Sequence, residues 1–503
     1  MSTGVERFRH MELNKTLLVL VSVAILTGIF MGYGTSLTPR DLLRGLVLFN
    51  VFLICYIVLL RDLVSGIVIY LYSLVFLNLY WRIIIPGAWP DLDIPRLMFV
   101  FLWLIFLLEV ILGHRRLLPT GAIGTVMLIV MGAILLSMIM ISHKRSTRPL
   151  LNAYVIPYAM FAVSKNIFTS RRAVDKFILW LSVPLAFYFP MTSIFEHFRI
   201  NSLLFPRYIG QPVVGDMEVD WGGRASGTFI NPAVTGLAMV GIYVMALYSL
   251  SKMKSAFART YAFVISAITP VGVFFTYTRS VYVAFAGSLL ILAVCSKRLR
   301  LVSIILLVAM GLAVLGNWSN MTSANREQGG VGDVTTAQSR MVILYASLQM
   351  IRDSPIVGCG FDRFVKEGAP YVAEVRQTVL GYKASWIAES CNQHNQFVSI
   401  FTEIGLMGFA PFVILYVLIL RLLWKARKVE AEEYDREFVV MVWAVMVGYI
   451  AVIMFIEPRW YEFMNVLPFM LLGIISGGYE RAMMRMRRGF QGRGFQGEKE
   501  YAA

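Results

Sequence analysis

Apolar runs long enough to cross a lipid bilayer fill most of this 503-residue sequence, and they restrict its fold more than any other feature. A helix that spans the hydrocarbon core needs roughly 17 to 25 mostly apolar residues. Candidate runs, of which 149–164 is the weakest, lie near 17–36, 42–60, 63–81, 97–113, 121–142, 149–164, 175–195, 228–250, 260–277, 281–296, 300–316, 396–423, 438–456 and 463–479. The sequence therefore predicts an all-α fold, a polytopic transmembrane helical bundle of about 12–14 spans.

The composition favours a membrane environment over nucleic acid. Only 15% of the residues are charged and 58% are hydrophobic. The net charge of +16 is spread over short basic clusters between apolar runs, which is typical of loops that face the cytoplasm. The first run, from Leu17 to Gly32, is not followed by a small-residue cleavage site, so we interpret it as a spanning helix and not as a signal peptide.

The basic clusters also predict the orientation of the bundle. Clusters around Lys165, Lys252, Lys297, Lys425 and Arg481 fall on alternate sides of successive runs, which makes all of them, and both termini, cytoplasmic. A cluster from His143 to Arg148 lies on the opposite side in this count and casts doubt on the span 149–164. We divide the chain into N-terminal transmembrane helices (1–148), central transmembrane helices (149–316), a large outer loop (317–395), C-terminal transmembrane helices (396–480) and a disordered cytoplasmic tail (481–503).

The large outer loop is longer than a connector requires, and loops of such length are usually functional. Within it, residues 338–352 are predicted to form a helix that ends at Ser354-Pro355. One helical face of this segment carries Met341, Leu344, Tyr345, Leu348 and Ile351. Two interpretations fit equally well: an amphipathic helix on the outer membrane surface, or a helix packed on the bundle.

Three ionisable side chains stand at the outer ends of spans. His394 lies in the run Cys391-Asn392-Gln393-His394-Asn395-Gln396, and its imidazole is suited to proton transfer, although it could equally cap the helix. Arg224 precedes one span, and Arg279 lies in a short turn between two spans. A charge at membrane depth needs a partner, and a guanidinium can form two parallel hydrogen bonds to phosphate. Either arginine could instead be an interfacial anchor.

Four segments together make the sequence resemble the O-antigen ligase and O-antigen (exopolysaccharide) polymerase family. They are Arg224-Ala225-Ser226-Gly227-Thr228-Phe229-Ile230-Asn231-Pro232, Thr278-Arg279-Ser280, Ser339-Arg340 through Pro355-Ile356-Val357-Gly358-Cys359-Gly360-Phe361, and His394-Asn395 with Glu403-Ile404-Gly405. The resemblance covers roughly residues 150–480. Members of this family are polytopic glycosyltransferases that join lipid-linked glycans at the outer face of the bacterial inner membrane.

The resemblance implies a mechanism and its partners. The donor would be a glycan on undecaprenyl diphosphate, bound through Arg224 and Arg279, and His394 would take the proton of an acceptor sugar hydroxyl. Arg340 would contact donor or acceptor, or pair with Asp353 or Glu389. Asn392 and Asn395 would orient the imidazole or bind sugar, although helix capping is their more common use. The expected partners are the lipid bilayer and other polysaccharide-assembly proteins, with no nucleic acid.

No metal or cofactor is implied by the resemblance. Asp216, Glu218 and Asp220 alternate in the first outer loop and could hold a divalent cation, but a solvated loop is the simpler interpretation. Because the periplasm is oxidising, Cys359 and Cys391 are expected to form a disulfide, whereas Cys55 and Cys295 lie in spans and should stay free thiols.

The acceptor stays open at this point. A polymerase would extend another lipid-linked repeat unit, and the apparent additional helices favour this interpretation slightly. A ligase would transfer the glycan to lipid A-core or to a protein. A transporter or flippase of lipid-linked sugars is a further alternative, but transporters place ionisable residues near the bilayer centre, and here the charges of interest line the outer edge. A non-catalytic scaffold would leave the outer loop and the outer arginines unexplained.

Overall fold

The computed structural model describes residues 62–77, 82–83, 92–141, 147–211, 213–214, 217–218, 223–316, 318–319, 334–379 and 393–500. Eight of the described helices are long and apolar enough to cross a membrane, and three shorter helices are also apolar. The prediction of a polytopic helical bundle is therefore confirmed, and the chain is a multi-pass membrane protein. The first two predicted spans, 17–36 and 42–60, and with them Cys55, lie outside the described residues.

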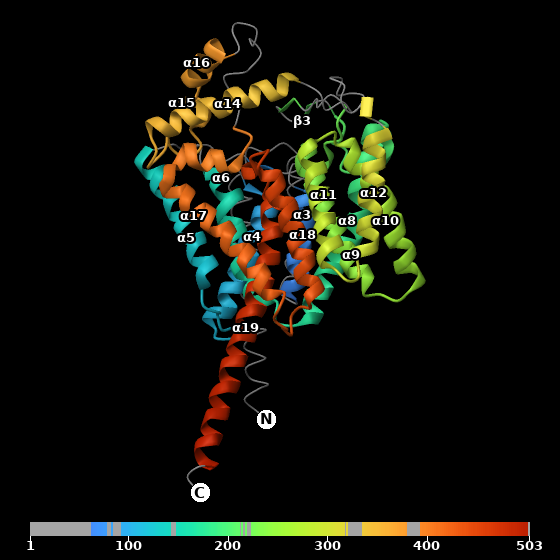
Figure 1. Ribbon diagram of the computed structural model, residues 1–503, viewed down its shortest axis with the longest axis vertical. Coiled ribbons are helices and arrows are strands. Elements are labelled where there is room, and N and C mark those ends of the chain that lie inside the picture. Colours follow the sequence, from blue (N-terminus) through green and yellow to red (C-terminus); the bar gives the residue numbers. More distant parts are fainter. Residues whose placement is uncertain are drawn as a thin grey trace, which may run out of the picture.

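Helices make up nearly all of the described structure (Figure 1). The bundle helices are α3 (Leu63–Phe76), α4 (Ile94–Ile111), α5 (Gly121–Ile141), α6 (Thr147–Leu150), η1 (Leu151–Val155), α7 (Ile156–Ile167), α8 (Arg171–His197), α9 (Pro232–Ser251), α10 (Ala256–Phe275), α11 (Arg279–Cys295), α12 (Arg300–Gly316), α17 (Gln396–Ala426), α18 (Arg436–Ile453) and α19 (Glu462–Glu500). The remaining helical elements are η2 (Asn201–Leu203), η3 (Gly227–Phe229), α14 (Val334–Asp353), α15 (Phe364–Glu367), α16 (Ala369–Val379) and η6 (Pro458–Trp460). We call the end of the bundle that carries α14, α15 and α16 the outer end (Figure 1). Two small antiparallel hairpins pair β1 (Arg82–Ile83) with β2 (Leu92–Asp93) and β3 (Val213–Val214) with β4 (Met217–Glu218).

Polar N-cap residues fix where many of the helices begin. A side-chain oxygen before the first turn accepts backbone N–H groups that would otherwise lack a partner in the helix. Residues that cap in this way are Asp62, Asp93, Ser170, Asn231, Ser255, Asn395 and Asp435. Pro232 follows the cap of α9, at a position where a missing N–H costs nothing. The apolar runs supply the spans, and these caps set their ends.

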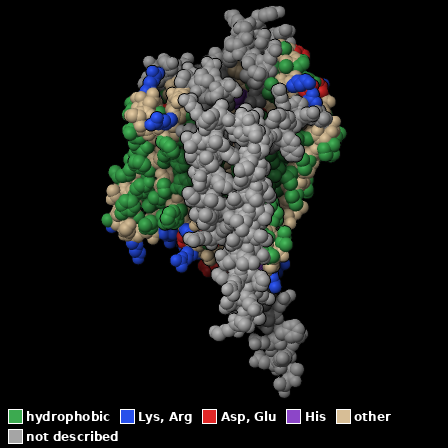
Figure 2. All heavy atoms as spheres, turned by 180° about the vertical axis from the view of Figure 1, so that it is seen from behind, with side chains coloured by type: hydrophobic (Ala, Val, Ile, Leu, Met, Phe, Trp, Pro, Cys, Tyr) green, Lys and Arg blue, Asp and Glu red, His purple; other side chains and the backbone are tan. Residues whose placement is uncertain are grey.

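Helices α9 and α19 form the core of the bundle. In each, 94% of the residues in the apolar window are buried, against 28% in α10 and 33% in α17. Helix α19 packs along α7, α9 packs on α8, and α11 packs on α18. On the face shown in Figure 2, apolar side chains cover the flanks, with Lys and Arg side chains towards both ends. This distribution fits a bundle whose outer helices face lipid.

Several of the basic clusters meet at one end of the bundle. Lys165 contacts Glu480 at 2.7 Å, and Arg481 contacts Glu433 at 2.5 Å. Lys252 pairs with Asp175 at 2.6 Å. Helix α19 leaves the bundle at this end, opposite α14, α15 and α16 (Figure 1). The relative orientation of these clusters is thus as expected, and the cytoplasmic assignment of this end stays a prediction.

The doubtful span 149–164 is helical over Thr147–Ile167, but it is not a regular α-helix throughout. Its start is a short α turn followed by the π turn η1, directly before Pro157, which has no N–H to donate. The guanidinium of Arg148 lies 5.9 Å from the centre of the Trp460 ring. This cation–π contact stabilises a positive charge at the outer end, against the bias that made the span doubtful.

Helix α14 is longer than the predicted 338–352 and packs through a different face. Val342, Ile343, Ala346 and Met350 are buried, and the helix packs against α16 and α17. The residues predicted to form its apolar face do share one face, but Met341, Leu344, Tyr345 and Leu348 are exposed. Both faces are apolar, so periodicity alone could not decide which one is packed.

Beyond residue 480 the structure differs from the disordered tail that we expected. Helix α19 continues to Glu500. The stretch from Arg481 to Arg488 consists of Arg, Ala and Met, which are strong helix formers and extend the helix out of the bundle. Residues 501–503 lie outside the described residues.

Candidate active site

Arg224 and Arg279 meet at a single turn at the outer end. Nε of Arg224 donates to the carbonyl of Thr276 at 3.1 Å, and its Nη2 donates to Oγ1 of Thr278 at 2.6 Å. Thr278 is the N-cap of α11, and Arg279 is the first residue of that helix, with an exposed side chain. Unpaired backbone N–H groups and the helix dipole make this N-terminus favourable for an anion. The turn therefore combines two guanidinium groups with a helix N-terminus.

The loop that carries Arg224 is held by a carboxylate that the sequence analysis did not single out. Both oxygens of Glu196 accept hydrogen bonds from the 226–227 segment: from Ser226 N–H at 2.9 Å, Ser226 Oγ at 2.7 Å and Gly227 N–H at 2.8 Å. The neighbouring His197 ring stacks on Phe275, with ring centres 3.9 Å apart. Glu196 thus fixes the Arg224 loop, while His197 packs against an aromatic ring.

His394 lies on the short segment that leads into α17. Its backbone φ is +53°, a left-handed conformation that is uncommon outside glycine and often marks a functional constraint. His394 is an exposed residue, yet the protein around its ring, and then the charge of Arg340, lower the pKa of His394 below its ordinary value of 6.5. At neutral pH the imidazole is therefore neutral and able to accept a proton.

The residues beside His394 have structural partners. Asn395 is the N-cap of α17, and its Oδ1 accepts the N–H groups of Phe397 at 2.9 Å and Val398 at 3.1 Å. Gln396 donates to the Tyr154 hydroxyl at 2.7 Å. Asn395 thus performs the capping role considered as its more common use. Asn392 and Cys391 lie outside the described residues.

Helix α17 is interrupted just below this segment, where the sequence predicts a continuous span over 396–423. Gly405 has φ 66° and ψ −163°, which are not helical values. The backbone groups freed by the break bond to the segment that follows α14. These bonds are Cys359 N–H to Thr402 O at 2.9 Å, Gly360 N–H to Glu403 O at 2.8 Å, Leu406 N–H to Pro355 O at 2.8 Å and Met407 N–H to Ile356 O at 3.1 Å.

Two glycines allow this close contact between backbones. A Cβ on Gly358 would lie 2.5 Å from the carbonyl oxygen of Glu403, and a Cβ on Gly405 would lie 2.3 Å from that of Ile356. Both glycines also have positive φ. Two of the family-like segments, 355–361 and 403–405, are therefore joined by main-chain hydrogen bonds, which gives a physical reason for their occurring together.

A buried ion cluster lies beside the break and centres on Arg459. Its guanidinium contacts three carboxylates, those of Glu403 at 3.1 Å, Glu457 at 3.1 Å and Asp362 at 3.3 Å. Burial raises the pKa of Asp362 to about 6 and that of Glu457 to about 7, while Arg459 opposes both shifts. Removal of one partner from such a buried network leaves an unpaired charge in the interior and strongly destabilises the fold.

The sequence did not predict this cluster, and of its members only Glu403 was named there, as part of a family-like segment. The available signal was the run Glu457-Pro458-Arg459-Trp460-Tyr461-Glu462, a connector with three charges between two apolar runs. Glu462, at its end, accepts a hydrogen bond from the buried Tyr70 hydroxyl. We refer to residues 457–462 as the outer turn.

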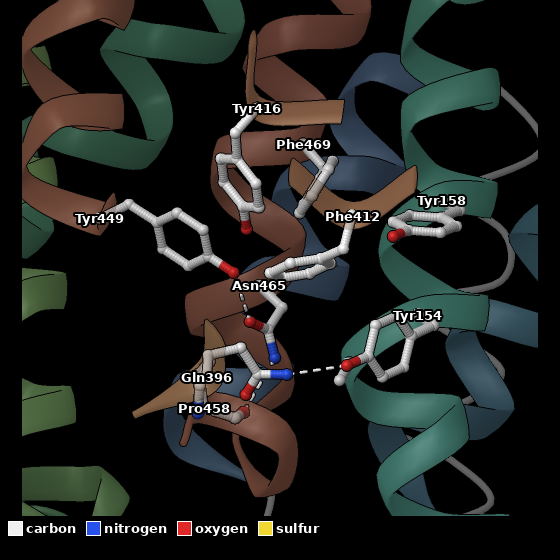
Figure 3. A pocket seen from close by; sticks show the side chains of 10 residues that line it. Tyr154, Tyr158, Gln396, Phe412, Tyr416, Tyr449, Pro458, Asn465 and Phe469 are labelled. Carbon is white, nitrogen blue, oxygen red and sulfur yellow. Dashed lines mark hydrogen bonds between the residues drawn. The ribbon is translucent and has the colours of Figure 1, made fainter. Parts of the chain in front are cut away.

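A tyrosine-lined cavity lies among η1, α7, α17, α18 and α19 (Figure 3). Tyr449 donates to Oδ1 of Asn465 at 2.9 Å, and the Gln396 amide reaches Tyr154. The remaining lining side chains are largely aromatic. These polar contacts connect the first residue of α17, two positions after His394, to the interior of the bundle.

The sequence-predicted residues form two groups. Arg224 and Arg279 share the turn before α11. The charge of the exposed Arg340 on α14 lowers the pKa of His394. Asp353, considered as a partner of Arg340, accepts a hydrogen bond from Tyr371 at 2.7 Å, and Glu389 lies outside the described residues. Cys359 is a thiol whose pKa burial raises to about 12, and its pairing with Cys391 stays a prediction. Glu218 lies in β4, whereas Asp216 and Asp220 are outside the described residues.

Comparison with known proteins gives one family match. Residues 261–413 match the family model described as O-antigen ligase, a range that contains Arg279, Arg340 and His394 and runs from α10 into α17. No curated protein matches the chain. The match supports the resemblance seen in the sequence over residues 261–413, and the segment from Arg224 to Pro232 lies outside the matched range.

Proposed function

We propose that the protein transfers a glycan from an undecaprenyl-diphosphate donor to a sugar hydroxyl at the periplasmic face of the bacterial inner membrane. The observation that carries the proposal is the family match, because it contains both an arginine at a helix N-terminus and a histidine with a lowered pKa. The match supports glycosyl transfer of the O-antigen ligase and polymerase type in general. In this proposal both termini are cytoplasmic, and no metal or cofactor takes part.

The proposed chemistry is a single displacement. The neutral imidazole of His394 takes the proton of the acceptor hydroxyl as its oxygen bonds to the anomeric carbon. The bond from that carbon to the diphosphate oxygen breaks, and its electrons leave with undecaprenyl diphosphate. Arg224 and Arg279 stabilise the negative charge that develops on this leaving group. The proton on His394 then passes to solvent.

We favour a polymerase of O-antigen or exopolysaccharide repeat units. The acceptor would then be a second lipid-linked repeat unit. A ligase is the alternative, in which lipid A-core or a protein receives the glycan. The description of the matched family model, O-antigen ligase, is the observation in favour of this alternative.

The test uses purified full-length enzyme with one lipid-linked repeat unit, with and without lipid A-core. We expect a ladder of longer glycans on the lipid carrier in the absence of lipid A-core. Product that forms only when lipid A-core or a protein acceptor is added would establish the ligase and exclude our preferred acceptor. An Arg279→Lys enzyme is the control for background transfer.

A further inference from the structure

The outer turn, residues 457–462, contacts both groups of candidate site residues. At one end, Glu457 Oε1 accepts the N–H of Gln393 at 3.0 Å, the residue directly before His394. At the other end, the Tyr461 hydroxyl accepts a hydrogen bond from the Asn231 amide at 2.9 Å. Asn231 caps α9 and is the last residue but one of the family-like segment that begins with Arg224. The turn therefore connects the His394 segment to the Arg224 loop.

We propose that the outer turn sets the position of His394 relative to the two arginines, with Glu457 and Arg459 as positioning residues for the base and Tyr461 as the positioning residue for the Arg224 loop. This inference rests on the proposed function. Glu457, Arg459 and Tyr461 would not contact the substrate. They would affect the reaction by holding the His394 segment and the Arg224 loop in place.

The position of the Glu457 carboxylate is fixed from several directions. Its Oε2 pairs with Nε of Arg459, and Nη1 of Arg459 pairs with Glu403 and Asp362. Glu403 lies at the break in α17, and Asp362 lies on the segment that fills this break, with its N–H bonded to Glu403 Oε2 at 3.0 Å. The acceptor for the Gln393 N–H is thus held by the same elements that interrupt α17.

The backbone at His394 needs such support. A non-glycine residue at φ +53° is in a conformation that persists only when its surroundings enforce it. The segment is held before His394 by Glu457 and after it by the Asn395 cap and the Gln396 amide. Loss of one anchor should let the imidazole shift, and a displacement of about 1 Å can lower a catalysed rate roughly 10²-fold.

The same turn supplies a matched control for Glu457. Glu462 is a second buried carboxylate in the outer turn, 5% exposed against 8% for Glu457. It accepts a hydrogen bond from Tyr70 on α3 and is not bonded to the His394 segment. A variant at Glu462 therefore reports on general damage to the turn, and a variant at Glu457 reports on damage plus loss of the His394 anchor.

The experiment compares Glu457→Ala, Glu457→Gln and Glu462→Gln in full-length purified enzyme with a lipid-linked repeat unit as substrate. We expect Glu457→Ala to lower kcat about 10²-fold while the donor KM changes less than about 3-fold. Glu457→Gln keeps an oxygen that accepts the Gln393 N–H, so its kcat should be within about 10-fold of the parent. Glu462→Gln should keep the kcat and the pH profile of the parent.

The pH profile separates positioning from simple destabilisation. When the segment is released, His394 becomes more hydrated and moves away from Arg340, so its pKa should return towards 6.5. The acid limb of the kcat profile should then shift to higher pH in Glu457→Ala and stay in place in Glu462→Gln. Equal losses of kcat in Glu457→Ala and Glu462→Gln, with an unshifted acid limb in Glu457→Ala, would overturn the inference.

Tyr461→Phe provides the second arm, because it removes only the hydroxyl that Asn231 contacts. We expect it to raise the donor KM several-fold with the acid limb unchanged, the reverse of the Glu457→Ala pattern. If Tyr461→Phe and Glu457→Ala change the same parameter, the turn does not position the two groups separately. A fully active His394→Ala enzyme would instead contradict the proposed function itself.

Discussion

At the scale of single residues, the lowered pKa of His394 predicts how activity depends on pH. In the proposed mechanism transfer requires the base form of the imidazole, and surrounding protein and Arg340 hold the pKa of His394 below 6.5. Activity should therefore be complete above the lowered pKa and fall as the pH drops through it. The acid limb of the proposed reaction belongs below pH 6.5.

Removal of the charge of Arg340 should move this limb. Arg340→Gln takes away a cation that disfavours the imidazolium, so the pKa of His394 should rise and the acid limb should shift to higher pH. Arg352→Gln is the control, because Arg352 is exposed on the same helix and is not a cause of the His394 shift. An unchanged acid limb in Arg340→Gln would show that Arg340 does not act on His394.

The arginines at the α10–α11 turn should depend on shape as well as on charge. Arg224 reaches Thr276 and Thr278 from two separate nitrogens of its planar guanidinium, a geometry that the single ammonium of Arg224→Lys does not have. We expect Arg224→Lys and Arg279→Lys each to lower transfer about 10²-fold or more with normal membrane insertion. Arg298→Lys, at an exposed position in the α11–α12 connection, is the control. Nearly full activity in both site variants would exclude binding of the diphosphate by the two guanidinium groups and would favour the alternative, that the arginines are interfacial anchors.

At the scale of elements, the break in α17 is the feature on which the outer site depends. It lets the 355–360 segment enter the bundle and brings Asp362 and Glu403 to Arg459. A continuous helix would have no free backbone groups for this segment to pair with. The break therefore connects the outer loop to the span that follows His394.

Alanine at Gly358 or Gly405 should destabilise the protein. Each new Cβ would meet backbone atoms closer than 3 Å at a positive φ, where L-residues are strained. We expect a lower Tm in detergent for both variants, by an amount that corresponds to about 1–3 kcal/mol. Gly311→Ala is the control, since a Cβ there has no neighbour within 4 Å and α12 continues through the position. A Tm equal to that of the Gly311→Ala protein would contradict the close approach.

The sequence predicted the described spans well, because a run of apolar residues has few other stable environments. It missed the break in α17, because the pattern around Gly405 stays apolar and hydropathy does not show which glycine has a positive φ. It chose the exposed face of α14, because partners such as Val372 on α16 come from distant sequence. It named Arg224, Arg279 and His394 from their outer positions and family likeness, but Glu457 and Arg459 become visible only when α17, α18 and the outer loop are packed together.

At the scale of the whole molecule, ion pairs such as Lys165–Glu480 gather at one end and the candidate site lies at the other. Buried α9 and α19 connect the two ends through the middle of the bundle. The outer end is the one in which α14 crosses over the bundle (Figure 1). This arrangement matches an enzyme whose substrates reach it at one membrane surface.

If the outer end faces an oxidising compartment, the cysteines at this end should be oxidised to a disulfide. We predict that Cys359 and Cys391 are joined by a disulfide, which would fasten the 391–395 segment to the segment that fills the α17 break. Mass spectrometry of protein purified without reductant should find this pair linked and Cys295, which is in α11, alkylated as a free thiol. Detection of both outer cysteines as free thiols would end the idea.

The most direct test of the account compares His394→Ala with His197→Ala in the purified full-length enzyme, with transfer and donor binding measured separately. A general base contributes roughly 10²- to 10⁴-fold, so His394→Ala should lose at least about 10²-fold in transfer and keep donor binding through Arg224 and Arg279. His197, which stacks on Phe275 close to the arginine turn, should matter far less. An essential His197 together with a dispensable His394 would place the catalytic base on the other outer loop and contradict the account.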